Sequence, residues 1–235
     1  MQIEFVKLLK KFPKSRPPLT EAQQSIFAKE YSMNRNGENL INNLSQKMES
    51  WMHRQVAKNT KGKNLLELGA GNLNHLKYQA IVEFGIYDVV EPMEFLYQNY
   101  KSKHKINCFY KDIKECSQKY ETIFSIAVLE HIIDLPDVIK KSISSLAQGG
   151  SFVNAIPTEG GLLWGISWRI TVGLSYFLRT GMSYKNIMKH EHVNNFDEII
   201  LLLKNFFNDV TIKYNFFPNK HLSLYACVVA KNPKI

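Results

Sequence analysis

The sequence contains no long hydrophobic run. No apolar stretch in its 235 residues approaches the roughly 18 residues that a membrane-spanning helix requires. The opening segment, MQIEFVKLLKKFPKSRPP, is charged but lacks the central apolar region of a secretory signal. We therefore expect a soluble, cytoplasmic protein.

Cysteine is also scarce. The chain has three cysteines, an odd number, and none stands in the C-x-x-C spacing of a metal site. Cys108 and Cys227 lie within apolar, strand-like runs. This pattern indicates reduced thiols that serve as small core residues, and it argues against a disulfide scaffold.

Internal repeats and low-complexity tracts are absent as well. Hydrophobic residues make up 45% of the chain and aromatic residues 12%, which is enough to bury a full core. The formal charge is +9. That charge favours contact with nucleic acid, a membrane surface or a phosphate-bearing substrate, although a merely solvated basic surface fits it equally well.

Short apolar runs alternate with helix-like segments from residue 64 onward. The runs are NLLEL, IYDVVE, INCFY, TIFSIAVL and SFVNAI, and the helix-like segments include NHLKYQAIVEF and LPDVIKKSISSLA. A helix-like FDEIILLLKNFF and two final runs, DVTIKYNF and LSLYACVVA, follow. Strict alternation predicts an α/β protein with a Rossmann-like, doubly wound and mostly parallel seven-stranded sheet, closed by an antiparallel C-terminal edge hairpin.

Two segments depart from this alternation. Residues 1–57 combine a short basic start, three prolines and a polar helical stretch over 21–57, so we predict an N-terminal helical extension that covers the cofactor. Residues 58–235 form the main domain. Residues 158–192 follow the fifth predicted strand and are rich in Trp, Tyr, Phe and Gly. Long connections at strand ends form lids or substrate pockets, so we predict a substrate lid here; a helical pair that only thickens the core is the alternative.

A glycine-rich turn follows the first predicted strand, in NLLELGAGNLNHL. Gly69 and Gly71 permit a tight turn and a close approach of the backbone to a ligand. A dinucleotide-binding turn needs a third glycine at the position of Asn74, and a P-loop needs Gly-Lys-Ser/Thr; both are absent. Glu91, at the end of the second strand, is placed to accept hydrogen bonds from both hydroxyls of a ribose.

The residues at successive strand ends resemble class I S-adenosylmethionine-dependent methyltransferases. The resemblance rests on the 67–71 turn, Glu91, Asp112 and the Leu-Glu-His turn at 129–131. It implies S-adenosylmethionine as cofactor and S-adenosylhomocysteine as product. It assigns the turn to the methionine end, Glu91 to the ribose, Asp112 with Ile113 to the adenine, and Ala127 with Val128 to the floor beside the sulfonium. The implied cofactor-binding residues are Glu67, Gly69, Ala70, Gly71, Asn72, Glu91, Pro92, Met93, Asp112, Ile113, Ala127 and Val128.

Flanking motifs look like those of methyltransferases of surface-polysaccharide and lipopolysaccharide biosynthesis. The motifs are YSMNR, WMH, EGGLLW, Tyr184-x-x-x-Met188 and EHVN. This narrower resemblance implies methylation of a sugar hydroxyl in a polysaccharide precursor, carried on a nucleotide or on a lipid. The implied substrate-binding residues are Tyr31, Asn34, Arg35, Glu159, Arg169, Tyr184, Glu191 and Asn194.

A sugar hydroxyl must lose a proton when it is methylated, and histidine suits the role of base. The candidates are His131, His190 and His192. The alternative for His131 is that it shapes the cofactor pocket. The alternative for His190 and His192 is that their segment, KHEHVN, docks the next helix. His190 and His192 would face the same way on an extended segment and diverge on a helix. No third ligand stands at a metal-like spacing, so we expect no metal.

Other functions also fit parts of the sequence. The charge permits an RNA methyltransferase, but no Asn-Pro-Pro-Tyr-type site follows the fourth strand and no basic-aromatic strip is present, so we do not expect nucleic acid as a partner. A non-catalytic scaffold that binds the cofactor is a third hypothesis, against which the intact 67–71 turn argues. The basic start and the aromatic residues Trp164, Trp168 and Tyr176 either contact an anionic membrane at its inner face or cover the core.

Overall fold

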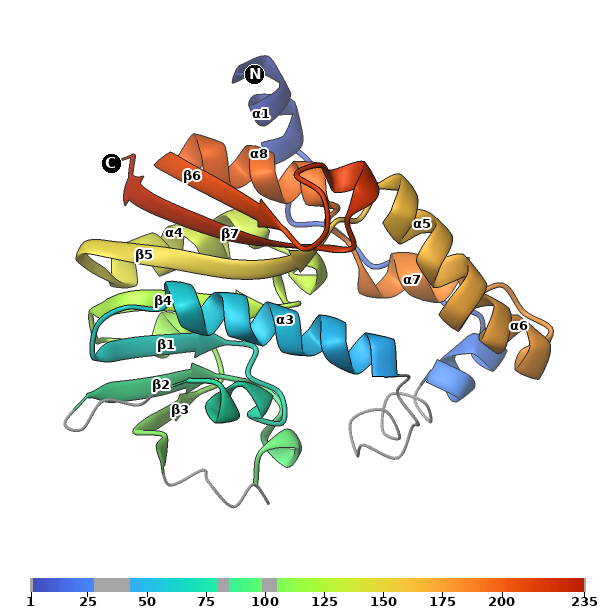
Figure 1. The fold of residues 1–235 in the computed structure, drawn as a ribbon, viewed down its shortest axis with the longest axis horizontal. Helices are drawn as coiled ribbons and strands as arrows, with labels where there is room; N and C mark the ends of the chain where they lie inside the picture. Colours follow the sequence, from blue (N-terminus) through green and yellow to red (C-terminus); the bar gives the residue numbers. More distant parts are fainter. Residues whose placement is uncertain (1, 28–42, 80–84, 99–104, 235) are drawn as a thin grey trace.

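A seven-stranded mixed sheet organises the protein. The computed structural model describes residues 2–27, 43–79, 85–98 and 105–234 (Figure 1). The strand order is β3-β2-β1-β4-β5-β7-β6. The first five strands are parallel, and β7 runs antiparallel to both β5 and β6. The prediction of a mostly parallel sheet with an antiparallel C-terminal hairpin is confirmed. The strands are β1 (Asn64–Leu68), β2 (Ile86–Val90), β3 (Cys108–Tyr110), β4 (Tyr120–Ile126), β5 (Leu146–Pro157), β6 (Phe207–Tyr214) and β7 (Tyr225–Pro233).

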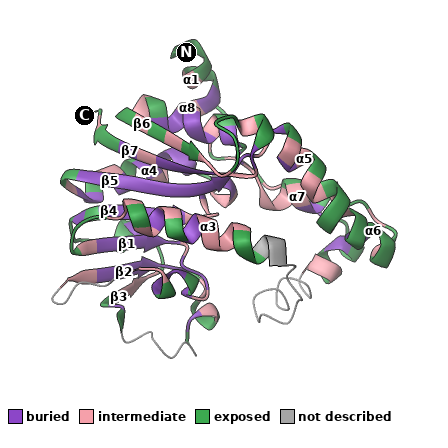
Figure 2. Ribbon diagram, viewed as in Figure 1, coloured by how far each residue is buried: buried purple, intermediate pink, exposed green. Residues whose placement is uncertain are grey.

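Helices cover both faces of the sheet (Figure 1). Successive side chains of a strand point to opposite faces, so Leu65 packs with Met52 and Val56 of α3 (Asn43–Asn59), whereas Leu66 packs with residues of the helices on the other face. Those helices are α1 (Gln2–Leu9), α4 (Leu135–Ser145) and α8 (Phe196–Phe206). The central strands are therefore buried on both sides, as Figure 2 shows.

Side-chain caps fix where the two long covering helices begin. The Asp134 carboxylate accepts a hydrogen bond from the backbone N–H of Asp137 at the start of α4, and Pro136 occupies the first turn. Asn195 and Glu198 form a reciprocal capping box at the start of α8. Both helices thus start directly after segments that contribute to the site described below.

The structure corrects one predicted helix and refines another. The helix expected over 74–84 is, as far as the described residues reach, a single 3₁₀ turn, η1 (Asn74–Lys77). Leu73 before it is fully buried with a positive φ of 58°, and this conformation directs the chain into the core before an α-helix can begin. The helix expected over 21–57 is helical at 21–27 and in α3, and residues 28–42 lie outside the described residues.

The segment predicted as a lid is helical. It comprises α5 (Leu162–Trp168), the π-helical turn η6 (Arg169–Gly173), α6 (Leu174–Thr180) and α7 (Lys185–Glu191). The first three run on as one rod, which ends at Gly181, a residue with a φ of 70° (Figure 1). Within the described ranges, no helix has the length and apolar character needed to cross a membrane.

The N-terminal helix covers the core. Leu8 of α1 is buried, and the ring of Phe5 packs edge-on against Phe206 of α8 at 5.8 Å between centroids. Lysines of the same segment are exposed. Of the two readings of the basic start, its packing supports the one in which it shields the core with a charged outer face.

Candidate active site

A cleft of about 1010 Å³ opens at the carboxyl ends of the parallel strands. Strand ends on either side of the point where the strand order reverses supply its walls, which is the usual position of a ligand site in such sheets. All twelve residues that the family resemblance assigned to the cofactor line this cleft: Glu67, Gly69, Ala70, Gly71, Asn72, Glu91, Pro92, Met93, Asp112, Ile113, Ala127 and Val128.

The glycine turn after β1 requires glycine. Gly69 and Gly71 have φ angles of 65° and 51°, a region that L side chains rarely adopt. A Cβ atom at Gly69 would lie 2.6 Å from a methyl carbon of Val128. The turn after β1 and the turn after β4 therefore touch, and a side chain at Gly69 would push them apart.

The Glu91 carboxylate is held rigidly in the cleft wall. Its side chain is buried, one oxygen accepts from the backbone N–H of Gly71 at 2.8 Å, and the other accepts from the N–H of Met93 at 3.0 Å. Each carboxylate oxygen has a second lone pair, so the group can still accept hydrogen bonds from a diol. This geometry fits a ribose, and it ties the Glu91 carboxylate to the glycine turn.

Glu67 lies deeper, under the same wall. Its carboxylate accepts a hydrogen bond of 2.6 Å from the hydroxyl of Tyr87. Burial raises the pKa of Glu67 to about 8, with a smaller contribution from the charge of Glu91, and the Tyr87 hydrogen bond opposes the shift. A neutral carboxyl that ionises when a cation arrives suits a ligand with an ammonium or sulfonium group.

Asp112 follows β3 and begins the short turn η4 (Ile113–Glu115). Its carboxylate accepts from the backbone N–H of Lys114 at 2.8 Å, which fixes the turn, and Ile113 is buried beside it. An acidic rim next to an apolar side chain can contact both the polar edge and the flat face of a planar base.

Further cleft residues were not identified as site residues from the sequence. Glu49, Met52 and His53 of α3 line it, and so does Arg16. Glu49, Met52 and His53 lie three or four residues apart or adjacent, so they share one face of α3. This helical spacing was the signal in the sequence that could have indicated them. Arg16 stands in a proline-rich segment without periodicity, and no pattern in the sequence indicated it.

Arg16 joins two walls of the cleft. Its guanidinium donates to the carbonyl of His190 at 2.7 Å and to that of His131 at 3.1 Å. His53, on the opposite wall, is paired with the fully buried His75 at 3.0 Å between the two Nδ1 atoms. Burial and the charge of His53 lower the pKa of His75 to about 3, so the imidazole of His75 stays neutral.

A cluster of histidines and carboxylates lies at the turn after β4, η5 (Leu129–His131). His131 lines the cleft, and its Nδ1 lies 2.9 Å from the carbonyl oxygen of Glu191. The ring of His192 packs edge-on behind it at 4.8 Å between centroids. Glu130 is 1% exposed, and one of its oxygens has no hydrogen-bond partner among the described residues.

Three carboxylates influence the protonation of this cluster. Burial opposes a charge on His192, but its 2.8 Å hydrogen bond to Glu159 and the charges of Glu130, Glu159 and Glu191 raise the pKa of the imidazole above its usual value. Burial raises the pKa of Glu130 to about 7, against the charge of His192. The pKa of Glu130 therefore lies near neutral pH, and His192 keeps its proton to a higher pH than a free imidazole does.

The remaining histidine candidate diverges from this cluster. His190 lies in α7 and His192 directly after it, so the two point apart, as expected for a helix. His190 lines the cleft, its Nδ1 lies 2.7 Å from the carbonyl oxygen of Pro17, and its ring contacts Phe27. It thus faces the N-terminal segment rather than the turn after β4.

The residues predicted to bind substrate are dispersed. Glu191 lines the cleft and Glu159 holds His192. Asn194 is fully buried, and its amide donates to the carbonyls of Leu129 and Ile132. Two more lie in the helical insertion: the exposed Arg169 stacks on Trp168, and Tyr184 packs against Trp168 and Tyr176. Tyr31, Asn34 and Arg35 lie outside the described residues.

The same cluster supplies groups that a metal ion could use. Glu130, His131 and His192 each bring one potential ligand atom within 4.8 Å of the others. The histidine pair considered from the sequence, His190 and His192, is not the pair in this group, and the expectation of no metal stays a prediction. Glu130 is adjacent to His131 in the sequence but 62 positions from His192, so no ligand-like spacing could have revealed the group.

The chain was compared with known proteins. A model of the methyltransferase domain family matches residues 40–225. The structure of the plantazolicin methyltransferase BpumL, in complex with a pentazolic desmethylPZN analog and SAH, is 15% identical, with 99% of this chain and 100% of that chain covered and a TM-score of 0.60. A methyltransferase from Thermotoga maritima, described as a possible histamine N-methyltransferase, is 13% identical over 91% of this chain and 100% of that chain, with a TM-score of 0.56.

The N-methyltransferase NodS from Bradyrhizobium japonicum is 15% identical over 82% of this chain and 98% of that chain, with a TM-score of 0.53. No curated protein sequence gives a significant match. The predicted cofactor agrees with the S-adenosylhomocysteine present in the BpumL structure. Since the family model spans well over half of its length, the chain belongs to the methyltransferase domain family, and the predicted enzyme class is confirmed.

Proposed function

We propose that this methyltransferase binds S-adenosylmethionine in the cleft and methylates a hydroxyl group of a small molecule, a sugar of a surface-polysaccharide precursor. The observation that carries the proposal is the position of His131. It lines the cleft directly after β4, beside Ala127 and Val128, and a buried group of titratable side chains backs it.

The chain's own residues fit the two ends of the cofactor. When bound, S-adenosylmethionine supplies an electrophilic methyl group on a sulfonium. Glu91 accepts the ribose hydroxyls from a position fixed by two backbone N–H groups. Glu67 ionises beside the positive charge of the ligand, which stabilises the complex relative to the neutral acid. Together these contacts orient the methyl group toward the turn after β4.

Proton removal falls to the pair His131 and His192. With its Nδ1 proton directed to the carbonyl of Glu191, a neutral His131 carries its basic lone pair on Nε2. The Glu159 carboxylate orients His192 behind it and stabilises the imidazolium form. A proton taken from the acceptor hydroxyl can thus be held inside the cluster while the methyl group is transferred.

Aromatic side chains of the insertion support a sugar as acceptor. Trp164 lies 5.9 Å from the ring of His192, and Trp168 lies next to both Trp164 and Tyr184. Flat aromatic faces pack against the C–H face of a sugar ring while polar groups bind its hydroxyls. In this arrangement residues 158–192 form the substrate lid, and Glu191 binds the acceptor at the cleft.

An amine is the second candidate acceptor. Among the similar structures, NodS is an N-methyltransferase and the Thermotoga maritima protein is described as a possible histamine N-methyltransferase. A histidine-carboxylate cluster can accept a proton from an ammonium group as well as from a hydroxyl.

A binding and acceptor screen tests the proposal. Calorimetry should show micromolar affinity for S-adenosylhomocysteine, as an order of magnitude, and none for NAD. Nucleotide sugars, lipid-linked saccharides, peptide amines and RNA are then offered with labelled S-adenosylmethionine. Label transferred to sugar hydroxyls supports the proposal, and label transferred only to amines or RNA contradicts it.

Single-turnover rates of histidine variants test the base. His131→Ala and His192→Ala should each lower turnover roughly 10²- to 10⁴-fold with cofactor affinity unchanged. A loss confined to His190→Ala would move the role to that residue. A rate that collapses in EDTA and returns with Mn²⁺ or Zn²⁺ would instead make the cluster a metal site.

A further inference from the structure

A row of apolar side chains lies exposed on the helical rod of the insertion. The largest exposed fractions are 77% for Leu178 and 64% for Ile170. Figure 2 shows α6 mostly exposed, in contrast to the buried central strands. Soluble proteins rarely leave such a continuous apolar surface without a partner. The exposed apolar residues of the rod are Leu162, Ile166, Ile170, Val172, Leu174, Phe177 and Leu178.

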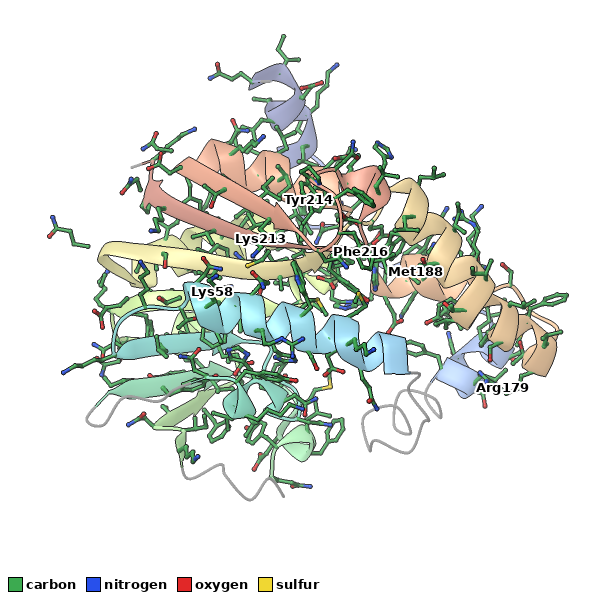
Figure 3. The ribbon with its side chains drawn as sticks, in the orientation of Figure 1. Lys58, Arg179, Met188, Lys213, Tyr214 and Phe216 are labelled. Carbon is green, nitrogen blue, oxygen red and sulfur yellow. The ribbon has the colours of Figure 1, made fainter. Side chains whose placement is uncertain are left out.

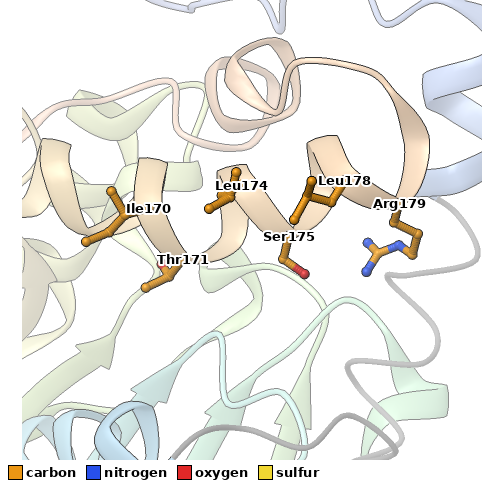
Figure 4. A pocket seen from close by; sticks show the side chains of 6 residues that line it. All are labelled: Ile170, Thr171, Leu174, Ser175, Leu178 and Arg179. Carbon is orange, nitrogen blue, oxygen red and sulfur yellow. The ribbon is translucent and has the colours of Figure 1, made fainter.

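The spacing of these residues makes one continuous stripe. Ile166, Ile170, Leu174 and Leu178 follow one another at intervals of four, and the last three form a row in Figure 4. Ile170, Leu174 and Leu178 border a shallow hollow of about 500 Å³ that Thr171, Ser175 and Arg179 complete. Tyr176, on the opposite side of the rod, is buried against the rest of the protein. The rod therefore packs through one face and presents an apolar face outward.

The charged residues of the insertion between 160 and 190 have a single sign. Residues 160–190 include no aspartate or glutamate, and they include Arg169, Arg179, Lys185 and Lys189. Arg179, labelled in Figure 3, lies at the outer end of α6. Residues 210–235 also lack acidic side chains, and the exposed Leu222 in η7 (Lys220–Leu222) lies in this second stretch, next to α5. Arg179 thus completes the hollow beside the stripe, and the insertion that carries the stripe has basic but no acidic side chains between 160 and 190.

We propose that this apolar and basic face docks the enzyme onto an anionic phospholipid surface. A helix lying in the membrane plane buries its apolar face among the acyl chains and places its basic residues among the lipid phosphates. A second copy of the chain fits less well. In a two-fold contact the same patch faces itself, so arginines and lysines would meet without an acidic residue in 160–190 to pair with them.

The docking face does not depend on the identity of the acceptor. If the acceptor is lipid-linked, however, docking through α5 and α6 brings it to the enzyme by diffusion in the plane of the bilayer. The insertion that carries the stripe also carries His190 and Glu191, which line the cleft. The lipid surface and the cleft therefore border the same helical segment.

Vesicle sedimentation of the full-length protein tests the proposal. The protein should sediment with vesicles of phosphatidylcholine and phosphatidylglycerol, and should stay in the supernatant with phosphatidylcholine alone. Added salt should weaken the binding. Ile170→Asp or Leu178→Asp should lower partitioning about tenfold or more, since each removes an apolar side chain from the acyl layer. Arg169→Gln and Arg179→Gln should each lower it about fivefold.

Ile3→Asp is the matched control, because Ile3 is a 73% exposed apolar residue on α1, the other basic amphipathic helix. It should bind vesicles as the parent protein does, and every variant should retain its affinity for S-adenosylhomocysteine. A loss of binding in Ile3→Asp alone would overturn the proposal. Failure to bind the anionic vesicles would overturn it as well. A dimer that Leu178→Asp dissociates would then identify the stripe as a contact between two copies of the chain.

Discussion

Replacement of Glu67 by glutamine should change how stability depends on pH. The folded protein raises the pKa of this carboxyl to about 8, mainly through burial, whereas the unfolded chain restores its ordinary value of 4.5. A raised pKa contributes stability that is fully present below 4.5 and is lost as the pH rises through 8. Glutamine keeps the oxygen that accepts from Tyr87 and has no proton to release.

The size of the effect follows from proton linkage. Between pH 5 and pH 7 the unfolded state has released the Glu67 proton and the folded state has kept it, so the unfolding free energy falls by about 1.4 kcal/mol per pH unit for this group. Glu130 adds a slope of the same sign, and His75, with its pKa lowered to about 3, adds the opposite sign up to its usual range. The difference between parent and Glu67→Gln protein isolates Glu67, at about 3 kcal/mol over the two pH units.

Urea unfolding of the cofactor-free protein at several pH values measures this difference. Glu121→Gln is the control, since backbone N–H groups of Lys63 and Asn64 lower the pKa of that exposed carboxyl and its linkage lies below pH 4.5. The slope of Glu121→Gln should match that of the parent protein. If Glu67→Gln also kept the parent slope, Glu67 would be ionised in the folded state and the account of its environment would fail.

Two further predictions concern the cleft. Glu91→Ala should weaken the binding of S-adenosylhomocysteine by about 1.5–3 kcal/mol, or ten- to a hundredfold, because it removes a charged acceptor of two hydroxyls. Calorimetry measures this, with Glu94→Ala at the exposed neighbouring carboxylate as the control. Equal affinities of the two variants would show that Glu91 does not bind the ribose. Glu159→Gln should shift the acidic limb of the pH–rate profile to lower pH, because it removes the hydrogen bond and charge that raise the pKa of His192. An unmoved limb would separate His192 from proton transfer.

The sequence was informative where function depends on order along the chain. Residues that end consecutive parallel strands, such as Glu67 and Glu91, must meet at one edge of the sheet once the alternation of strands and helices is recognised. The role of Gly69 in a tight turn could also be predicted from the sequence, because few other residues fit such a turn. These inferences use only local pattern and a fold rule.

The acceptor side depends on packing and was less accessible. Glu130 lies within a recognised turn, but its burial and its approach to His192 follow from how α7 returns to the sheet. Arg16 reaches the cleft from a segment that precedes the sheet, and no periodic pattern around it indicates which way its side chain points. Contacts between residues so far apart in the sequence leave no periodic pattern of hydrophobic and polar residues from which they could be predicted.

The contacts of Arg16 have a consequence for the order of folding. This residue, near the start of the chain, bonds carbonyls that lie 115 and 174 positions later in the sequence. Contacts of such high sequence separation form late, because the chain between them must first be closed into a loop. During synthesis Arg16 is made 174 residues before its partner carbonyl at His190. The wall of the cleft that Arg16 ties together can therefore be completed only after His190 has been added to the chain.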